Sequence, residues 1–280
     1  MKRIVRALLV RFPWISEWVP PAVRRAANRL LCVAIVYRGP FASFAAALRE
    51  TRSYQDDRIL QDVRKAIQGV LGGRARFEQD GVAFRQEPLP DLALSGLLLA
   101  SSRAGGRLSV LDFGGSLGSH FLRWLPIFSR LPNLHWCVVE QAHFVDAGRE
   151  LFGPEQRLSF ELDIDSAAKH APNAVLASSV LQYLDDPASY LSNLARLGTD
   201  VLIIDRFPIS DDGLHHVLTQ RVPGKDGSAS YPLQVFPGDW LQGELGKTFE
   251  LLVELPGRDA PIRAGRIAAR YVGSVWILKR

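Results

Sequence analysis

The clearest pattern in the chain is an alternation of short hydrophobic, β-rich runs with longer helix-like stretches, which begins at residue 108. The β-rich runs cover residues 108–113, 134–140, 158–162, 173–178 and 201–205. The stretches between them cover residues 118–129, 143–152, 165–170 and 187–197. This alternation predicts βαβ units, and therefore a parallel sheet with helices on both faces.

Two further β-rich runs, 249–254 and 271–279, follow the five expected parallel strands. Residues 260–270, between them, show no strong helical pattern, so we expect the two runs to form a terminal antiparallel pair. The fold class predicted for this part is α/β and Rossmann-like, with five parallel strands plus the terminal pair.

The first hundred residues predict mainly helices. Hydrophobic residues recur at helical spacing in segments 1–37, 42–50 and 57–70, and Asp91 is placed to cap a further helix through about residue 102. Residues 38–40, Arg-Gly-Pro, are typical of a turn or linker, and Asp80-Gly81 predicts a tight hairpin. We therefore divide the chain into a basic helical segment (1–37), a helical cap region with a short hairpin (38–104) and a main domain (105–280).

Charge is distributed unevenly along the 280 residues. The net charge is +5, yet residues 1–30 alone carry +6 and the remainder sums to −1. The main domain therefore lacks the broad basic face of a nucleic-acid enzyme, and we expect no nucleic-acid partner. Two interpretations of residues 1–30 stay open: a surface helix that touches anionic lipid, or a helix packed on its own domain with a solvated basic side. The short apolar face favours the second.

The location and the metal content are also constrained. Two cysteines without CxxC spacing exclude a disulfide scaffold and a cysteine-based zinc site, and they fit a reducing cytoplasm. No run of 18 uncharged apolar residues is present, so we expect no membrane span. The expected location is cytoplasmic, with a peripheral position at the inner membrane face if residues 1–30 touch lipid.

A glycine-rich turn is the most informative stretch. Residues 110–119 read Val-Leu-Asp-Phe-Gly-Gly-Ser-Leu-Gly-Ser, so a buried strand turns on glycines and enters a helix. Glycine lets the backbone approach a ligand closely, and a ligand in such a fold binds at the carboxyl end of the first strand. The predicted cofactor-binding residues of this turn are Asp112, Gly114, Gly115, Ser116 and Gly118. A tight structural connection is the alternative.

Polar residues also end the next three strands. Glu140 follows the second strand, 22 residues after Gly118, where a carboxylate can accept hydrogen bonds from ribose hydroxyls. Asp163 follows the third strand and can accept from an adenine amino group. Ser178 and Ser179 end the fourth. We predict that all four contact the cofactor.

Both NAD and S-adenosylmethionine (SAM) fit a ribose-binding acid, and two features favour SAM. Asp112 stands immediately before the glycines, where a carboxylate suits the cationic ammonium end of SAM better than a pyrophosphate. The chain also finishes with an apparent antiparallel strand pair, instead of a second complete βαβ half. An NAD-dependent oxidoreductase is therefore the less favoured alternative.

The ordered set of motifs resembles the class I SAM-dependent methyltransferases. More narrowly, it is similar to a family of poorly characterised bacterial methyltransferases that are often encoded with genes for lipopolysaccharide or other surface polysaccharide synthesis. The segments that carry the likeness are residues 110–119, 136–141, 178–184 and 203–206, with further matches at 39–41 and 54–60. The resemblance implies the fold, a SAM site and a glycan or small-molecule acceptor. One departure is Ser116, where the general methyltransferase pattern has glycine.

Methyl transfer to a sugar hydroxyl would gain from a general base. The residues that could supply one near the strand ends are Asp205, His120, His215 and His216. His120 is more simply explained as a support of the glycine turn, and His215-His216 as a solvated or capping pair, so no base is assigned. The other histidines lack metal-ligand spacing, and we expect no metal. The functional hypotheses are a SAM-dependent methyltransferase that acts on a hydroxyl of a glycan or surface-polysaccharide precursor, and a methyltransferase-like binding or assembly protein without catalysis.

Overall fold

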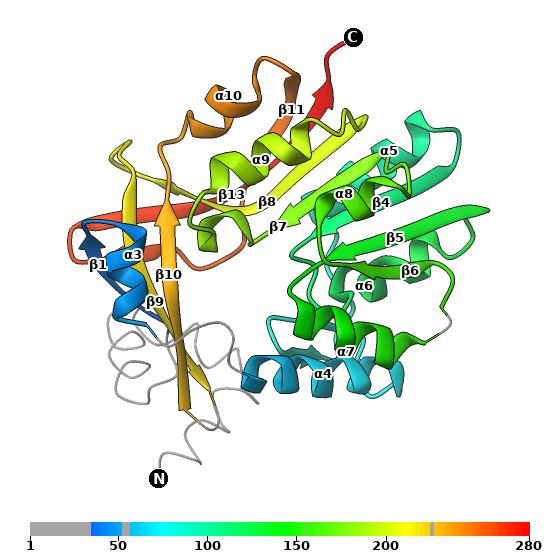
Figure 1. Cartoon of the computed structure of the whole chain (residues 1–280), viewed down its shortest axis with the longest axis horizontal. Coiled ribbons are helices and arrows are strands. Elements are labelled where there is room, and N and C mark those ends of the chain that lie inside the picture. Colours follow the sequence, from blue (N-terminus) through cyan, green and yellow to red (C-terminus); the bar gives the residue numbers. More distant parts are fainter. Residues whose placement is uncertain (1–34, 52–56, 154, 225–226) are drawn as a thin grey trace.

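A computed structural model describes residues 35–51, 57–153, 155–224 and 227–280. Its largest element is an eight-stranded sheet with the order β11-β13-β8-β7-β4-β5-β6, in which short β12 pairs with β13 (Figure 1). The strands of this sheet are β4 (Arg107–Phe113), β5 (Asn133–Val139), β6 (Leu158–Glu161), β7 (Ala174–Ser178), β8 (Val201–Ser210), β11 (Phe249–Pro256), β12 (Ile262–Ala264) and β13 (Ile267–Leu278).

The predicted α/β class is confirmed, because the centre of this sheet is parallel. β4 pairs in parallel with β5 and β7, and the parallel ladder continues to β6 on one side and to β8 on the other. β13 pairs antiparallel with both β8 and β11. The sheet differs from the expected seven strands by the short β12, which falls in the 260–270 segment that showed no clear pattern.

Helices cover both faces of the sheet, as Figure 1 shows. They are α5 (Leu92–Arg103), α6 (Ser119–Phe128) and α7 (Ala142–Phe152) on one face, and α8 (Ile164–Ala168), η2 (Leu181–Tyr183), α9 (Pro187–Ala195) and α10 (Trp240–Leu245) on the other. Alternate residues of each strand point to opposite faces, so Val110 packs in the first core and Leu111 in the second. Burial on both faces explains why the central strands β4 and β7 are nearly continuous hydrophobic runs.

The region before β4 contains α3 (Phe44–Arg49), α4 (Asp57–Leu71) and the hairpin of β2 (Phe77–Gln79) and β3 (Val82–Phe84). The predicted hairpin and the predicted Asp91 cap are both present, since the Asp91 carboxylate accepts from the Leu94 backbone N–H at 2.9 Å. The turn expected at residues 38–40 is wrong, because these residues lie within β1 (Val36–Phe41). β1 also contains Val36 and Tyr37, which the sequence placed at the end of the basic helix. The rest of that helix, residues 1–34, lies outside the described residues.

A second sheet was not predicted. β1, β9 (His216–Gly224) and β10 (Gly227–Val235) form a three-stranded antiparallel sheet, and a bridge between Ile209 and Phe236 connects it to the end of β8. In Figure 1 this small sheet and α3 lie on one side of the molecule, while α4 and α7 lie on the other. The carboxyl ends of the parallel strands open between these two groups.

No helix in the described part of the chain is long and apolar enough to cross a membrane.

Candidate functional site

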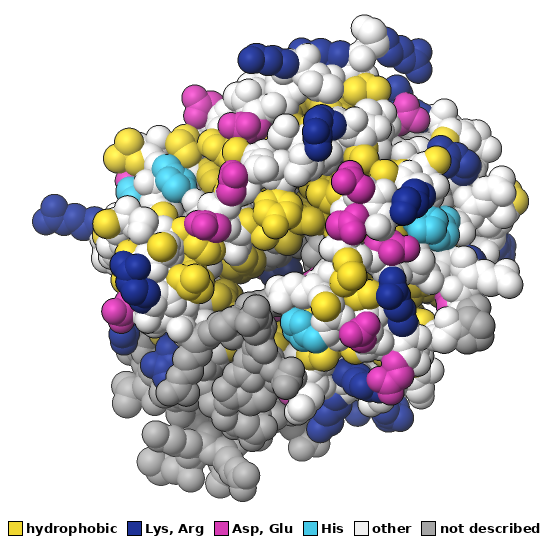
Figure 2. All heavy atoms as spheres, viewed as in Figure 1, with side chains coloured by type: hydrophobic (Ala, Val, Ile, Leu, Met, Phe, Trp, Pro, Cys, Tyr) yellow, Lys and Arg dark blue, Asp and Glu magenta, His cyan; other side chains and the backbone are white. Residues whose placement is uncertain are grey.

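A cavity of about 2600 Å³ lies at the carboxyl ends of the parallel strands. Figure 2 shows the surface hollowed near the centre of this face. Its walls come from the strand ends of the main sheet, the β2–β3 hairpin, α4, the small sheet and the loop between β11 and β12. Single small-molecule pockets usually measure about 300–1,000 Å³, so the cavity has room for two ligands side by side.

The glycine turn forms one wall of the cavity, and Gly114, Gly115 and Ser116 all line it. Gly114 has a φ of 73°, and a Cβ placed there would lie 2.5 Å from Cγ2 of Val180. Ser116, which stands where the general pattern has glycine, takes a left-handed φ of 56°. The turn therefore retains the conformation that glycine would give it, at the cost of a strained serine.

Asp112 does not reach the cavity. Its side chain is fully buried beneath Gly115, where it accepts from Nε1 of Trp136 at 3.0 Å and contacts Nδ1 of His120 at 3.3 Å. A Cβ on Gly115 would lie 2.5 Å from the Asp112 carboxylate, so Gly115 allows the turn to cover it closely. The contact of Asp112 with the cofactor ammonium stays a prediction.

Glu140 lies at the cavity wall directly after β5. Its carboxylate accepts from the Gln141 backbone N–H at 2.8 Å and from the backbone N–H of Ser116. Burial raises the pKa of Glu140 to about 7, because desolvation outweighs these two hydrogen bonds. The glycine turn and the acid predicted to bind ribose are thus in direct contact.

Ser178 and Ser179 end β7 on the other side of the turn, and both line the cavity. The Ser178 hydroxyl donates to the Asp205 carboxylate at 3.3 Å, and Ser179 accepts from Nε2 of Gln182 at 3.1 Å. Asp205, one of the catalytic candidates, also lines the cavity, and burial raises its pKa. The order of the strands reverses between β4 and β7, so these residues flank the switch point where ligands bind in open α/β sheets.

Besides Asp112, four residues proposed from the sequence do not line this cavity. Gly118 has a φ of 77° and packs toward Leu158, so bulk at this position would disturb the fold directly. Asp163 caps α8 by accepting from the Ser166 backbone N–H at 2.7 Å, and this bond lowers its pKa. His215 contacts Gln234, and His216 contacts Asp212. Their proposed roles in binding and catalysis have no support from their positions.

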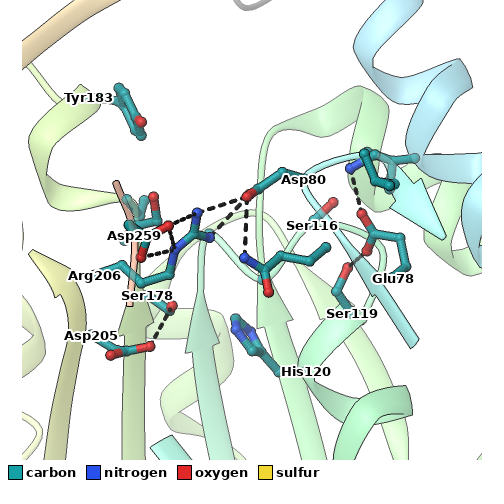
Figure 3. Close-up of a pocket in the computed structure, with 18 of the residues that line it drawn as sticks. Glu78, Asp80, Ser116, Ser119, His120, Ser178, Tyr183, Asp205, Arg206 and Asp259 are labelled. Atoms are coloured by element: carbon teal, nitrogen blue, oxygen red, sulfur yellow. Dashed lines mark hydrogen bonds and ion pairs between the residues drawn. The ribbon is translucent and has the colours of Figure 1, made fainter. Parts of the chain in front are cut away.

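An arginine between two carboxylates is a feature that the sequence did not indicate. Arg206, directly after Asp205, pairs with Asp80 at 2.7 Å and with Asp259 at 3.0 Å (Figure 3). Burial alone would lower the pKa of Arg206. The two carboxylates outweigh this effect and raise the pKa above its usual high value. The cluster links β8 to the tip of the β2–β3 hairpin and to the β11–β12 loop, so it holds the two sides of the cavity together.

Strained backbone is concentrated at the cavity. Five non-glycine residues of the described segments have a positive φ, and four of them line the cavity: Asp80, Ser116, Ser179 and Arg206. Such conformations cost about 1–3 kcal/mol each and cluster at functional sites.

The composition of the lining is distinctive as well. All five tyrosines in the described residues line the cavity: Tyr37, Tyr183, Tyr190, Tyr231 and Tyr271. Among the residues that the structure describes, eight carboxylates line it against four lysines and arginines. The acids are Asp62, Glu78, Asp80, Glu87, Asp91, Glu140, Asp205 and Asp259. The described part of the lining is therefore formally negative, in a protein whose net charge is positive.

No protein-family model and no curated protein matches the chain. Among solved structures, the N-terminal domain of EvdMO1, crystallised in the presence of SAH and D-fucose, is 14% identical with a TM-score of 0.43, over 81% of this chain and 100% of that one. The sugar N-methyltransferase KedS8 from Streptoalloteichus sp ATCC 53650 is 18% identical with a TM-score of 0.42, over 67% and 87%. These likenesses are distant, so the assignment of the fold rests on the strand order of this chain.

Proposed function

We propose that the protein is a SAM-dependent methyltransferase that methylates a hydroxyl of a glycan or surface-polysaccharide precursor. The observation that carries the proposal is the contact between Glu140 and the glycine turn at the wall of a cavity. Glu140 keeps lone pairs for two ribose hydroxyls, and the exposed backbone of Gly114 and Gly115 gives a ligand close access. The five parallel strands followed by an antiparallel pair also agree with the sheet that the sequence resemblance implies.

The charge of the cavity separates SAM from a dinucleotide. A dinucleotide places its pyrophosphate at the N-terminus of the helix after the glycine turn. Here a carboxylate lies beside the first turn of α6, because the Ser119 hydroxyl bonds to the buried Glu78 side chain. Asp80, Asp91 and Asp205 line the same cavity. Carboxylates repel a pyrophosphate and attract the sulfonium and ammonium groups of SAM.

The tyrosine-rich wall supports a hydroxyl-rich acceptor. Tyr183 donates to Oε1 of Gln220 at 3.0 Å and meets Tyr231 edge-to-face at 5.2 Å. Tyrosine rings offer a flat apolar face together with a hydroxyl group, which suits a ring that carries both C–H and O–H groups. Carboxylates outnumber lysines and arginines in the described part of the lining, which disfavours a phosphorylated ring at this wall. We expect SAM-dependent gain of one methyl group when isolated cell-envelope glycans are analysed by mass spectrometry, and a methyltransferase-like binding protein would show none.

The raised pKa of Glu140 predicts that the affinity for the cofactor depends on pH. S-adenosylhomocysteine (SAH) should bind about tenfold more weakly at pH 6 than at pH 8, because protonation of a group with a pKa of about 7 removes the ribose acceptor. Glu140→Gln should weaken binding at pH 8 by about 1–3 kcal/mol and flatten the pH dependence. Isothermal titration calorimetry with SAH measures both effects.

The matched control for this prediction is Glu150→Gln, which removes an exposed carboxylate outside the cavity and its pair with Arg64. This variant should bind SAH as the parent protein does at both pH values. Unchanged affinity in folded Glu140→Gln would remove Glu140 from the site, and binding of NAD in place of SAH would overturn the choice of cofactor.

We further propose that residues 1–30 bind anionic membranes, because they hold a net charge of +6. Each Lys or Arg near an anionic surface contributes about 1 kcal/mol. The full-length protein should sediment with vesicles of anionic lipid at low salt, less at high salt, and little with neutral vesicles. Replacement of Lys2, Arg3, Arg6 and Arg11 by serine should reduce this sedimentation. Equal sedimentation of both proteins would favour a helix packed on its own domain.

A further inference from the structure

His120 and Asp112 form a dyad at the edge of the cavity. Nδ1 of His120 lies 3.3 Å from Oδ2 of Asp112, and Nε1 of Trp136 donates to the same oxygen at 3.0 Å. The Asp112 carboxylate is fully buried, whereas the His120 side chain is 18% exposed and lines the cavity. An acid that accepts at Nδ1 keeps the proton on that nitrogen, and it fixes the orientation of the ring.

The other ring nitrogen, Nε2, forms no hydrogen bond with any residue in the described segments. Figure 3 shows His120 rising from the start of α6 below Asp80 and Arg206, with Ser178 and Asp205 on one side. Because the dyad leaves the lone pair of Nε2 unused, this nitrogen can accept a proton from a group that enters the cavity.

The charged groups around His120 come from every element that faces it. Burial alone would lower the pKa of His120, but the Asp112 carboxylate outweighs it, so the pKa is raised above its usual value. Arg123 on α6 opposes this effect. The remaining carboxylates that interact with the ring are Glu78 and Asp80 from the hairpin, Asp91 before α5 and Asp205 at the end of β8.

We propose that His120 is the general base of the methyl transfer and that Asp112 is its positioning residue, an inference that rests on the proposed function. When bound, SAM supplies an electrophilic methyl group, whose carbon–sulfur electron pair stays on sulfur as SAH forms. The acceptor oxygen forms the new bond to the methyl carbon and gives its proton to Nε2 of His120. Asp112 stabilises the resulting imidazolium.

The carboxylates around His120 favour the cationic groups of the cofactor at this position. Four acids and Asp112 interact with the ring, so the cofactor carboxylate is repelled there, while the sulfonium and the ammonium are both attracted. In the proposed reaction the sulfonium, which carries the reacting methyl group, lies beside His120. A sulfonium beside the ring would favour neutral imidazole, because it opposes the effect by which Asp112 raises the His120 pKa. Loss of the sulfonium charge on transfer would restore the affinity of the ring for the proton.

The test compares SAM with SAH, which differ only by the methyl group and the positive charge. The full chain is labelled with ¹³C at the histidine Cε1 positions and titrated by NMR without ligand, with saturating SAH and with saturating SAM. His120→Gln identifies the His120 signal. His170 serves as the internal control, because it stacks on His135 and does not line the cavity.

We expect the pKa of His120 to be about one to two units lower with SAM than with SAH, while the His170 signal does not distinguish the two ligands. Asp112→Asn should lower the His120 pKa in the unligated protein. Equal His120 pKa values with SAM and with SAH would overturn the inference. If both ligands raise the His120 pKa equally above its value in the unligated protein, the cofactor carboxylate, and not the sulfonium, lies beside His120. If calorimetry shows that neither ligand binds, the proposed function itself fails.

A second measurement tests the proton transfer itself. Transfer of radiolabelled methyl from SAM to an isolated cell-envelope glycan fraction should fall at least about a hundredfold in His120→Gln, with SAM affinity within about threefold of the parent protein. His170→Gln should retain the parent rate. A rate in His120→Gln within tenfold of the parent would assign the proton to another group, for which Asp205 is the remaining cavity candidate.

Discussion

Gly114→Ala should destabilise the protein by about 2–5 kcal/mol and remove measurable SAM binding. A left-handed backbone costs a residue with a Cβ about 1–2 kcal/mol, and overpacking adds about 1–3 kcal/mol. Both apply here, because Gly114 has a φ of 73° and its Cβ would lie 2.5 Å from Cγ2 and 2.8 Å from Cβ of Val180. Urea denaturation gives the loss of stability, and calorimetry with SAM gives the loss of binding.

Gly105→Ala is the matched control for this substitution. Gly105 also has a positive φ, 61°, but no atom lies within 4 Å of the position of its Cβ. It should therefore lose only the backbone contribution of about 1–2 kcal/mol and keep SAM binding. In a double-mutant cycle, Val180→Gly should recover about 1–3 kcal/mol of the loss in Gly114→Ala. Equal losses at Gly114 and Gly105 would show that the turn does not depend on the contact with Val180.

The main sheet could be predicted because its local and long-range signals agree. The central strands β4 and β7 are buried on both faces, so they are nearly continuous hydrophobic runs, and glycine or capping residues mark the helix boundaries. Asp91 shows the same agreement, since it precedes a hydrophobic helix and caps it in the structure.

The small sheet lacks such signals. β1 is mostly exposed and contains Gly39-Pro40, which is typical of a turn. β9 and β10 bury Gln220 and Gln234, whose side chains bond to Tyr183 and to the Leu184 carbonyl. Polar residues at core positions remove the alternation by which a strand is recognised. Only the tertiary partners make these positions favourable.

The candidate site likewise contains residues that could be predicted from the sequence and residues that could not. Glu140 and the glycine turn follow from strand-end position, a rule that depends only on local order. The same rule selected Asp163, but that aspartate also precedes a helix, and capping of α8 competes for its carboxylate. Asp80, Arg206 and Asp259 are far apart in the sequence and come together only through the hairpin and the β11–β12 loop, so no local pattern marks them.

Arg206→Met should cost about 2–4 kcal/mol, because it leaves two carboxylates without their partner at a partly buried site. The Arg206 side chain is 21% exposed, Asp259 25% and Asp80 60%, so solvent moderates the full cost of a broken buried pair. Burial opposes ionisation of Asp80, but Arg206 outweighs it and lowers its pKa below the usual 3.8. The contribution is therefore present at neutral pH and is lost as the pH falls through this lowered value.

The control for Arg206 is Arg270→Met, which breaks an exposed pair with Asp211 at 3.0 Å and should cost about 0–1 kcal/mol. Urea denaturation of both variants at pH 7 and pH 3 measures the difference. Because the Arg206 cluster joins β8 to the hairpin and to the β11–β12 loop, its loss should also raise hydrogen exchange at residues 77–84 and 257–261 before global unfolding. If Arg206→Met and Arg270→Met lose the same stability, and exchange in both segments is unchanged, the cluster does not hold the cavity walls together.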